Sequence, residues 1–162
     1  MPLDFLNTLE IHFDLVKHAD ITCIPQAIDG LKNGYRLKSR INCCLGGETI
    51  KQVPTGVRVV DFPEFSVDSS TPGLGIINMF VEACCVSDEV LLNEYGIRTL
   101  GPNIINKYYN MDVNGEIVVT LQNTTKDLFY LDPGDDISII TFNIKPLVEF
   151  TINPIALVTP RT

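Results

Sequence analysis

The sequence predicts an all-β protein with one short helix, and three observations lead to this fold class. Residues 115–123 alternate between apolar and polar, so that Ile117, Val119 and Leu121 face one side, as in a strand with one solvent-exposed face. Comparable runs follow one another along the chain, separated by turn sequences of Gly, Pro and Asn. Helix signals gather in one short segment, at about residues 88–95.

The predicted strands and turns alternate along the chain. Strands are expected at residues 9–15, 50–59, 79–86, 103–106, 115–123 and 136–142, and turns at 46–47, 71–75, 123–126 and 132–135. Because the strands at 103–106, 115–123 and 136–142 follow one another closely, we expect them to form one antiparallel unit. The last strand or strands lie between residues 144 and 158, where two prolines favour edges or kinks.

The predicted helix has clear start and stop signals. Ser87 is the expected N-cap, Asp88 and Glu89 suit the first turn, and Gly96 suits the end. The N-terminus of a helix binds phosphate readily, because unpaired N–H groups and the positive end of the dipole face outward. Here the two carboxylates satisfy that end and would repel a triphosphate. We interpret the segment as a capped structural helix, with a metal site at Asp88 and Glu89 as the alternative.

Size and charge limit the possible functions. The chain has 162 residues, 45% of them hydrophobic and 20% charged, which suits one domain over residues 1–162 and is too short for two ordinary ones. The formal charge is −8 and the pI is about 4.6. A nucleic-acid partner is therefore disfavoured, because such binding depends on Lys and Arg that neutralise phosphates. The net charge does not exclude a local patch of basic residues.

Targeting signals and cysteines point to a reducing compartment. No run of eighteen apolar residues is present, so we expect no membrane span, and residues 1–4 do not begin a signal peptide. We expect a cytoplasmic or nuclear protein. Of the five cysteines, four form the adjacent pairs Cys43–Cys44 and Cys84–Cys85. Neighbours on a strand face opposite sides, so neither pair can clamp one metal; we predict apolar core thiols, no metal and no cofactor, with zinc or redox work as the alternative.

The only two histidines, His12 and His18, lie in the first predicted strand and just after it. No Ser or Cys near them has the pattern of a nucleophile motif. We interpret both as surface or edge-strand residues rather than catalytic ones.

Several segments resemble motifs of the all-β family of dUTP pyrophosphatases (dUTPases), over roughly residues 9–150 and most strongly over 33–150. The matching segments, each with the family motif that it resembles, are Asn-Gly-Tyr-Arg-Leu-Lys-Ser at 33–39 (Ala-Gly-Tyr-Asp-Leu-x-Ala), Asn-Ile-Ile-Asn at 103–106 (Gly-Val-Ile-Asp), Val-Asn-Gly-Glu at 113–116 (Tyr-Arg-Gly-Glu) and Gly-Asp-Asp-Ile-Ser-Ile at 134–139 (Gly-Asp-Arg-Ile-Ala-Gln). The resemblance implies a β-barrel or jelly-roll with one short helix. It also implies a homotrimer with each active site at a subunit boundary.

The framework of these motifs persists, whereas the reactive residues are replaced. Arg36 stands where the family has an Asp that organises the metal-triphosphate end of the site. Asp88 and Glu89 stand where a Pro-Arg-Ser-Gly-Leu motif holds phosphate oxygens with its Arg and Ser. Asn106 aligns with the carboxylate that activates the attacking water, and an amide cannot act as a general base at neutral pH.

Three further positions of the family pattern are also changed. Val113 replaces the Tyr that discriminates against ribose, and Asp136 and Ile139 replace the Arg and Gln of the fourth motif. Residues 144–162 do not show the Gly-rich, Phe-containing pattern of the tail that closes over the nucleotide in the family, so we expect no such closure. The resemblance therefore implies no catalytic residues in this chain.

These replacements predict a non-catalytic dUTPase relative that acts as a protein-binding or accessory module, and the source we expect is a virus, where such a module engages a host protein. Candidate contact residues are the loop aromatics Phe62, Phe65, Tyr108 and Tyr109 and the segment 157–162, because loop aromatics often anchor interfaces; packing against their own domain is the alternative. Two other functions stay open. One is a divergent nucleotide pyrophosphatase or dCTP-deaminase relative using Glu116, Asp88 or Glu89, and the other is a structural jelly-roll protein of a particle.

Overall fold

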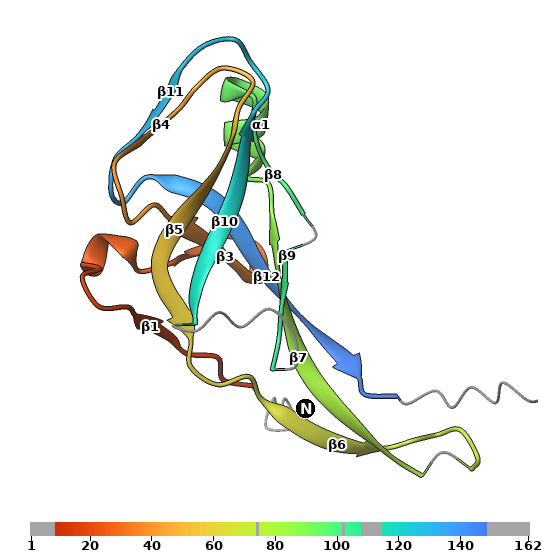
Figure 1. Ribbon diagram of the computed structural model, residues 1–162. Helices are drawn as coiled ribbons and strands as arrows, with labels where there is room; N and C mark the ends of the chain where they lie inside the picture. The colour runs from red at the N-terminus through yellow and green to blue at the C-terminus, as the bar shows by residue number, and fades with distance from the viewer. Residues whose placement is uncertain (1–8, 74, 102, 108–114, 149–162) are drawn as a thin grey trace, which may run out of the picture.

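Antiparallel strands and one α-helix build the chain in the computed structural model, which describes residues 9–73, 75–101, 103–107 and 115–148 (Figure 1). In chain order the elements are β1 (Phe13–Leu15), the 3-10 turn η2 (Ile21–Cys23), β2 (Gln26–Ile28), β3 (Leu31–Lys38), β4 (Cys43–Leu45), β5 (Ile50–Val59), β6 (Glu64–Asp68), β7 (Ile76–Val86), α1 (Glu89–Tyr95), β8 (Ile97–Thr99), β9 (Asn103–Ile105), β10 (Glu116–Asn123), β11 (Phe129–Leu131) and β12 (Asp136–Pro146). The predicted all-β class with one short helix is confirmed.

The strands form two main sheets and one small one. One sheet has the order β1-β5-β10-β8, the other has the order β2-β3-β12-β7-β6 with β9 also paired to β7, and β11 pairs with β4. In Figure 1 the pair β5 and β10 lies over the pair β3 and β12. The side chains that meet between these sheets form the core.

The predicted antiparallel unit of residues 103–106, 115–123 and 136–142 is wrong. β9 pairs with β7, β10 pairs with β5 and β8, and β12 pairs with β3 and β7. Each connection between these three strands carries the chain from one sheet to the other, so successive strands take their partners from earlier parts of the sequence. Such long-range pairings are typical of a jelly-roll and leave no signal in local spacing.

The alternation predicted for β10 is confirmed, because Ile117, Val119 and Leu121 are all buried. They belong to one cluster with Leu37 of β3 and Ile140 of β12, together with buried residues of β5, β7 and β8. Complete burial of one such side chain contributes about 1.5–3 kcal/mol. Strands from both sheets therefore depend on the same core.

The helix forms as predicted, but its N-cap is one residue later. Asp88, not Ser87, is the N-cap: its Oδ1 accepts a hydrogen bond from the N–H of Val90 at 2.9 Å. Ser87 Oγ instead accepts the N–H of Thr99 at 2.9 Å and so joins the helix start to β8. Gly96 ends the helix in the left-handed region with φ 68°, as predicted.

Long strands extend one sheet into an arm away from the body (Figure 1). The arm consists of β6, the first half of β7 and the end of β12; it carries exposed apolar side chains such as Val67, Ile76 and Leu147. The predicted loop at 71–75 falls between β6 and β7 in the sequence, and its described residues, 71–73 and 75, belong to neither strand. Apolar groups at such a site are available to another molecule.

The cysteines are free, and Cys23 and Cys85 are buried, as predicted for core thiols, whereas the other three are half-buried. Burial raises the pKa of Cys85 to about 12. Within the described ranges no group of three or more His, Cys, Asp or Glu side chains is placed to hold a metal ion. The helix in the described part of the chain is not long and apolar enough to cross a membrane.

Candidate functional site

Four strands and the start of the helix bring several of the predicted site positions together. In the cross-strand register Ile139 of β12 lies opposite Arg36 of β3 on one side and Val86 of β7 on the other, and Arg36 lies opposite Gln26 of β2. After Val86 the chain enters α1 through Asp88. This row of paired residues therefore fixes Arg36 and Ile139 beside the first turn of the helix.

Two cations and two carboxylates form a charged group at this point, the Arg36 cluster, which consists of Arg36, Lys38, Asp88 and Asp136. Nη1 of Arg36 lies 3.7 Å from Oδ2 of Asp136 and 4.0 Å from Oδ2 of Asp88. Nζ of Lys38 contacts Oδ1 of Asp136 and donates a hydrogen bond to Oε1 of Gln26 at 2.7 Å. Positive and negative charges are equal in number, so the cluster is balanced internally.

Burial makes this balance important. Only 2% of the Asp88 side chain and 8% of the Lys38 side chain are exposed, whereas Asp136 is 34% exposed. A buried charge without a partner is strongly destabilising, so these groups need one another. Asp88 has two tasks, because one carboxylate oxygen caps the helix and the other faces Arg36.

A cavity of about 340 Å³ lies beside the cluster, between β12 and the first turn of α1. Its lining residues are Ile28, Arg36, Val86, Ser87, Asp88, Glu89, Val90, Ile139 and Thr141. Arg36 is the only cation among them, and Asp88 and Glu89 are the two anions, which gives the lining a formal charge of −1. The cavity therefore combines apolar walls with an excess of negative charge.

The other predicted positions lie elsewhere in the described chain or outside it. Asn106 is buried, and its Nδ2 donates a hydrogen bond to Oε1 of Glu82 at 3.4 Å. Phe62 is half-buried and packs against the core. Val113, Tyr108, Tyr109 and the segment 157–162 lie outside the described residues.

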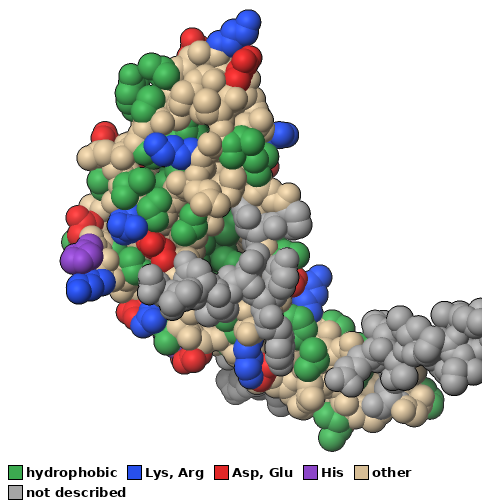
Figure 2. All heavy atoms as spheres, viewed as in Figure 1, with side chains coloured by type: hydrophobic (Ala, Val, Ile, Leu, Met, Phe, Trp, Pro, Cys, Tyr) green, Lys and Arg blue, Asp and Glu red, His purple; other side chains and the backbone are tan. Residues whose placement is uncertain are grey.

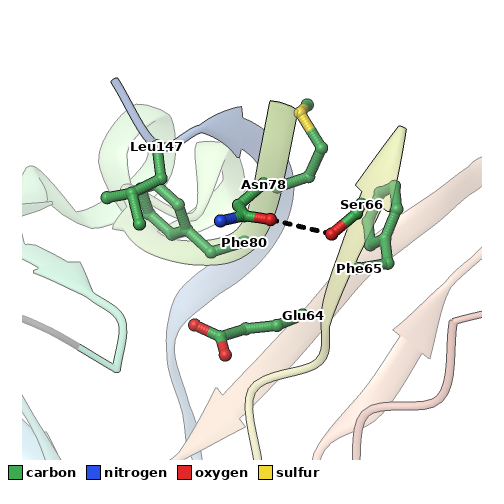
Figure 3. Close-up of a pocket in the computed structure, with 7 residues that line it drawn as sticks. Glu64, Phe65, Ser66, Asn78, Phe80 and Leu147 are labelled. Carbon is green, nitrogen blue, oxygen red and sulfur yellow. Dashed lines mark hydrogen bonds between the residues drawn. The ribbon is translucent and has the colours of Figure 1, made fainter. Parts of the chain in front are cut away.

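The prediction that Phe65 lies in a loop is wrong, because it belongs to β6 of the arm. It lies beside a cavity of about 260 Å³ (Figure 3). The cavity lies between β6 and β7, and its lining is completed by Glu64, Ser66, Asn78, Met79, Phe80 and Leu147. Ser66 and Asn78 hydrogen-bond across the two strands, 2.8 Å apart. Nζ of Lys107 lies 2.8 Å from Oε2 of Glu64, so an ion pair joins the residue after β9 to β6.

Sequence comparison and structure comparison give different results. A scan against protein-family models and a search of curated protein sequences give no match. Among solved structures, the dUTPase from Streptococcus mutans aligns with a TM-score of 0.58 and 20% identity, over 86% of this chain and 98% of that chain. A mutant dUTPase from phage phi11 of S. aureus aligns at 0.60 and 12%, over 90% and 95%. The EIAV dUTPase aligns at 0.55 and 15%, over 88% and 100%.

This chain has the dUTPase fold. The alignments cover nearly all of both chains, so the likeness extends beyond a shared sheet to the whole arrangement of strands and helix. The identities of 12–20% are far too low to transfer a catalytic residue on similarity alone. What the Arg36 cluster can do must therefore be inferred from its own residues and contacts, not from the likeness to dUTPase structures.

Lys38 is a member of the Arg36 cluster that sequence reasoning missed. A signal was present, because residues two apart on a strand share a face and Lys38 therefore accompanies Arg36. The carboxylate that pairs with Lys38 could not be predicted from strand periodicity. Asp136 reaches Lys38 only through the pairing of β3 with β12, a contact between distant parts of the dUTPase fold.

Proposed function

We propose that this chain is a non-catalytic protein with the dUTPase fold that acts as a protein-binding or accessory module. The observation that carries the proposal is the buried carboxylate of Asp88, which caps its own helix and faces Arg36. By the resemblance described above, this is the position at which the family holds phosphate oxygens with an Arg. A group that binds anions has been replaced by an anion with two partners of its own.

Electrostatics support this proposal. Two unit charges of like sign at about 4 Å repel by roughly 4 kcal/mol at an effective dielectric constant of about 20. A phosphate oxygen brought next to Asp88 would meet this repulsion, and Glu89 adds a second carboxylate to the cavity wall. Arg36 offers little compensation, because its guanidinium is already shared between Asp88 and Asp136.

Two other positions considered for catalysis, Glu116 and Asn106, also have structural partners. Glu116 accepts hydrogen bonds from Nε and Nη2 of Arg40 at 2.8 and 3.3 Å and from the N–H of Gly56 at 2.9 Å. Asn106, aligned with the family's general base, is an amide bonded to Glu82. A base must be able to take a proton from water, and neither group is placed to do so.

A regulatory role has a precedent among the structures of this fold. The dUTPases of Staphylococcus bacteriophage 80alpha are described as controlling the transfer of virulence genes by a proto-oncogenic G protein-like mechanism. Phage and EIAV proteins also support a viral source for this chain. We infer a homotrimer from the family resemblance, which a light-scattering mass near three times the 18.0 kDa of one chain would support.

The proposal is tested by incubating the purified chain with dUTP and other nucleoside triphosphates in the presence of Mg²⁺. Pyrophosphate release and the melting temperature are measured together, since a ligand that binds the folded state raises the latter. We expect no release and no nucleotide-dependent shift. Turnover that disappears in Asp88→Asn or in Glu116→Gln would overturn the proposal in favour of a divergent pyrophosphatase.

A further inference from the structure

A third cavity, of about 470 Å³, lies away from the Arg36 cluster, where β1 runs toward η2 and passes the ends of β5 and β10. Its lining residues are Leu15, Val16, Lys17, His18, Arg40, Arg58 and Glu116. The proposed function uses Glu116 and Arg40 only as partners of each other and uses none of the other lining residues. This group is called the basic cavity below.

The charge of the basic cavity is opposite to that of the chain as a whole. Three cations, Lys17, Arg40 and Arg58, face one carboxylate, Glu116, so the lining carries a formal charge of +2 with His18 neutral. Counting the adjacent Asp14, whose carboxylate pairs with Arg58, reduces this to +1. The whole chain has a charge of −8. Figure 2 shows Lys and Arg side chains mixed with Asp and Glu side chains on its left flank.

These cations differ in how firmly they are held. Arg40 is fixed by a two-bond fork to Glu116, which is itself anchored by the N–H of Gly56. Arg58 has an exposed partner, since Nη2 lies 3.0 Å from Oδ2 of Asp14 and about half of each side chain is exposed. Exposed pairs of this kind contribute little, so Arg58 can exchange one carboxylate for another at small cost.

Lys17 and His18 complete the cavity and are both exposed. Within the described part of the chain, neither has an ion-pair partner. His18 has φ 72°, in the left-handed region, which His adopts more often than most residues other than Gly. The turn therefore presents an ammonium group and an imidazole at the mouth of the cavity.

We propose that the basic cavity binds an acidic, extended segment of a partner protein. The cations come from three separate parts of the chain and are interrupted by the apolar Leu15 and Val16. This spread suits several carboxylates spaced along a peptide better than one compact phosphate group. Among the strands that the structure describes, β1 is an edge strand of its sheet and leads directly into the cavity, so its outer edge can pair with an extended backbone.

This inference rests on the proposed function, because it names the kind of segment that a protein-binding module would recognise. The local positive charge of the basic cavity also explains how a chain with a net charge of −8 could attract an acidic partner. Screening in physiological salt limits the repulsion of distant charges to about 8 Å, so the nearby cations of the cavity dominate once contact is made. Binding should therefore weaken with salt and depend on Lys17 and Arg58.

The test uses the full chain and a short fluorescein-labelled peptide of alternating glutamate and leucine, with binding followed by fluorescence anisotropy. A peptide with lysine in place of glutamate is the control ligand. We expect the acidic peptide alone to bind, and Lys17→Glu and Arg58→Glu each to weaken its binding about tenfold, equivalent to about 1.4 kcal/mol. Lys51→Glu, an exposed lysine of β5 outside the cavity, makes the same change in net charge as Lys17→Glu and should leave binding unchanged.

Three outcomes would overturn the inference. They are no binding of the acidic peptide, an equal loss in Lys51→Glu, and displacement of the peptide by inorganic phosphate but not by chloride at equal ionic strength, which would assign the cavity to a small anion. Each variant is first checked for a melting curve like that of the unchanged chain, and Arg58→Gln replaces Arg58→Glu if that variant does not fold. A failure of this test would not decide whether the chain turns over nucleotides, because the earlier assay measures pyrophosphate release separately.

Discussion

Oδ2 of Asp88 lies 4.0 Å from Nη1 of Arg36, and only 2% of the Asp88 side chain is exposed. The two residues come from the start of α1 and from β3, so this contact ties the helix to a sheet with which it shares no backbone hydrogen-bond ladder. It also neutralises, within the protein, a cation that could otherwise meet a ligand. If the proposed function holds, stability and the exclusion of anionic ligands depend on the same carboxylate.

Replacement of Asp88 by Ala should destabilise the protein by about 1–2 kcal/mol. The change removes the cap of α1, a loss of about 0.5–2 kcal/mol by itself, and it leaves Arg36 with Asp136 alone. The free energy of unfolding in urea measures the effect. Glu89→Ala is the matched control, because that carboxylate is exposed and should change stability by less than about 0.5 kcal/mol. Equal losses in the two variants would contradict the role of Asp88.

Replacement of Asp136 by Asn should cost on the order of 2 kcal/mol, because Lys38 would keep its buried charge without a carboxylate. This is below the roughly 3–5 kcal/mol of a fully buried pair, since Asp136 is a third exposed and solvent screens part of the interaction. Denaturant unfolding of Lys38→Met/Asp136→Asn completes the comparison. That double variant should be more stable than Asp136→Asn alone, and the reverse order would show that Lys38 does not need its partner.

Cys85 should make stability depend on pH in the alkaline range. Burial raises the pKa of this thiol from 9.0 to about 12, so the unfolded chain ionises first as pH rises. The stability that comes from keeping the thiol neutral is fully present below pH 9 and is lost between about pH 9 and 12, by roughly 1.4 kcal/mol per pH unit. Urea unfolding at pH 8 and pH 10 should show a larger loss for the unchanged chain than for Cys85→Ala. Equal losses in the free energy of unfolding for the two proteins would contradict the assignment of this pH dependence to Cys85.

Gly96 should tolerate Ala poorly for two separable reasons. Its φ of 68° is strained for any residue with a Cβ, by about 1–2 kcal/mol, and a Cβ there would lie 2.5 Å from Cγ2 of Thr125. Gly30 isolates the first cause, because it has φ 80° with nothing within 4 Å of an added Cβ. Thermal or urea unfolding should therefore rank Gly96→Ala clearly below Gly30→Ala. If the two melt alike, the contact with Thr125 yields without cost.

Local patterns predicted the elements well. The alternation of Ile117, Val119 and Leu121 indicated the buried face of β10, and Gly96 indicated the end of the helix, because each signal comes from residues adjacent in sequence. Ser87 and Asp88 are both good caps, and only the hydrogen bond from Thr99, a residue of another element, draws Ser87 away from the helix start. Local signals could not decide between them.

Contacts between distant segments were beyond the sequence. Arg36, Asp88 and Asp136 were each singled out by their departure from a family motif, yet nothing in their spacing indicated that they would contact one another. The charge pattern of the basic cavity was equally hidden, since Lys17, Arg40 and Arg58 meet only after β1 pairs with β5. Sheet pairing decides both sites, and pairing is a property of the whole fold.

The position of β12 between β3 and β7 has a consequence for how this protein can change over generations. A slip of β12 by a single residue would turn Ile140 outward and, in the same movement, carry Asp136 away from Lys38. An insertion or deletion in this strand would therefore have two costs. It would expose an apolar core residue, and it would leave the buried ammonium group of Lys38 without its carboxylate. Sequence changes in the neighbouring loops should be tolerated more easily, whereas Asp136 must keep its position opposite Lys38.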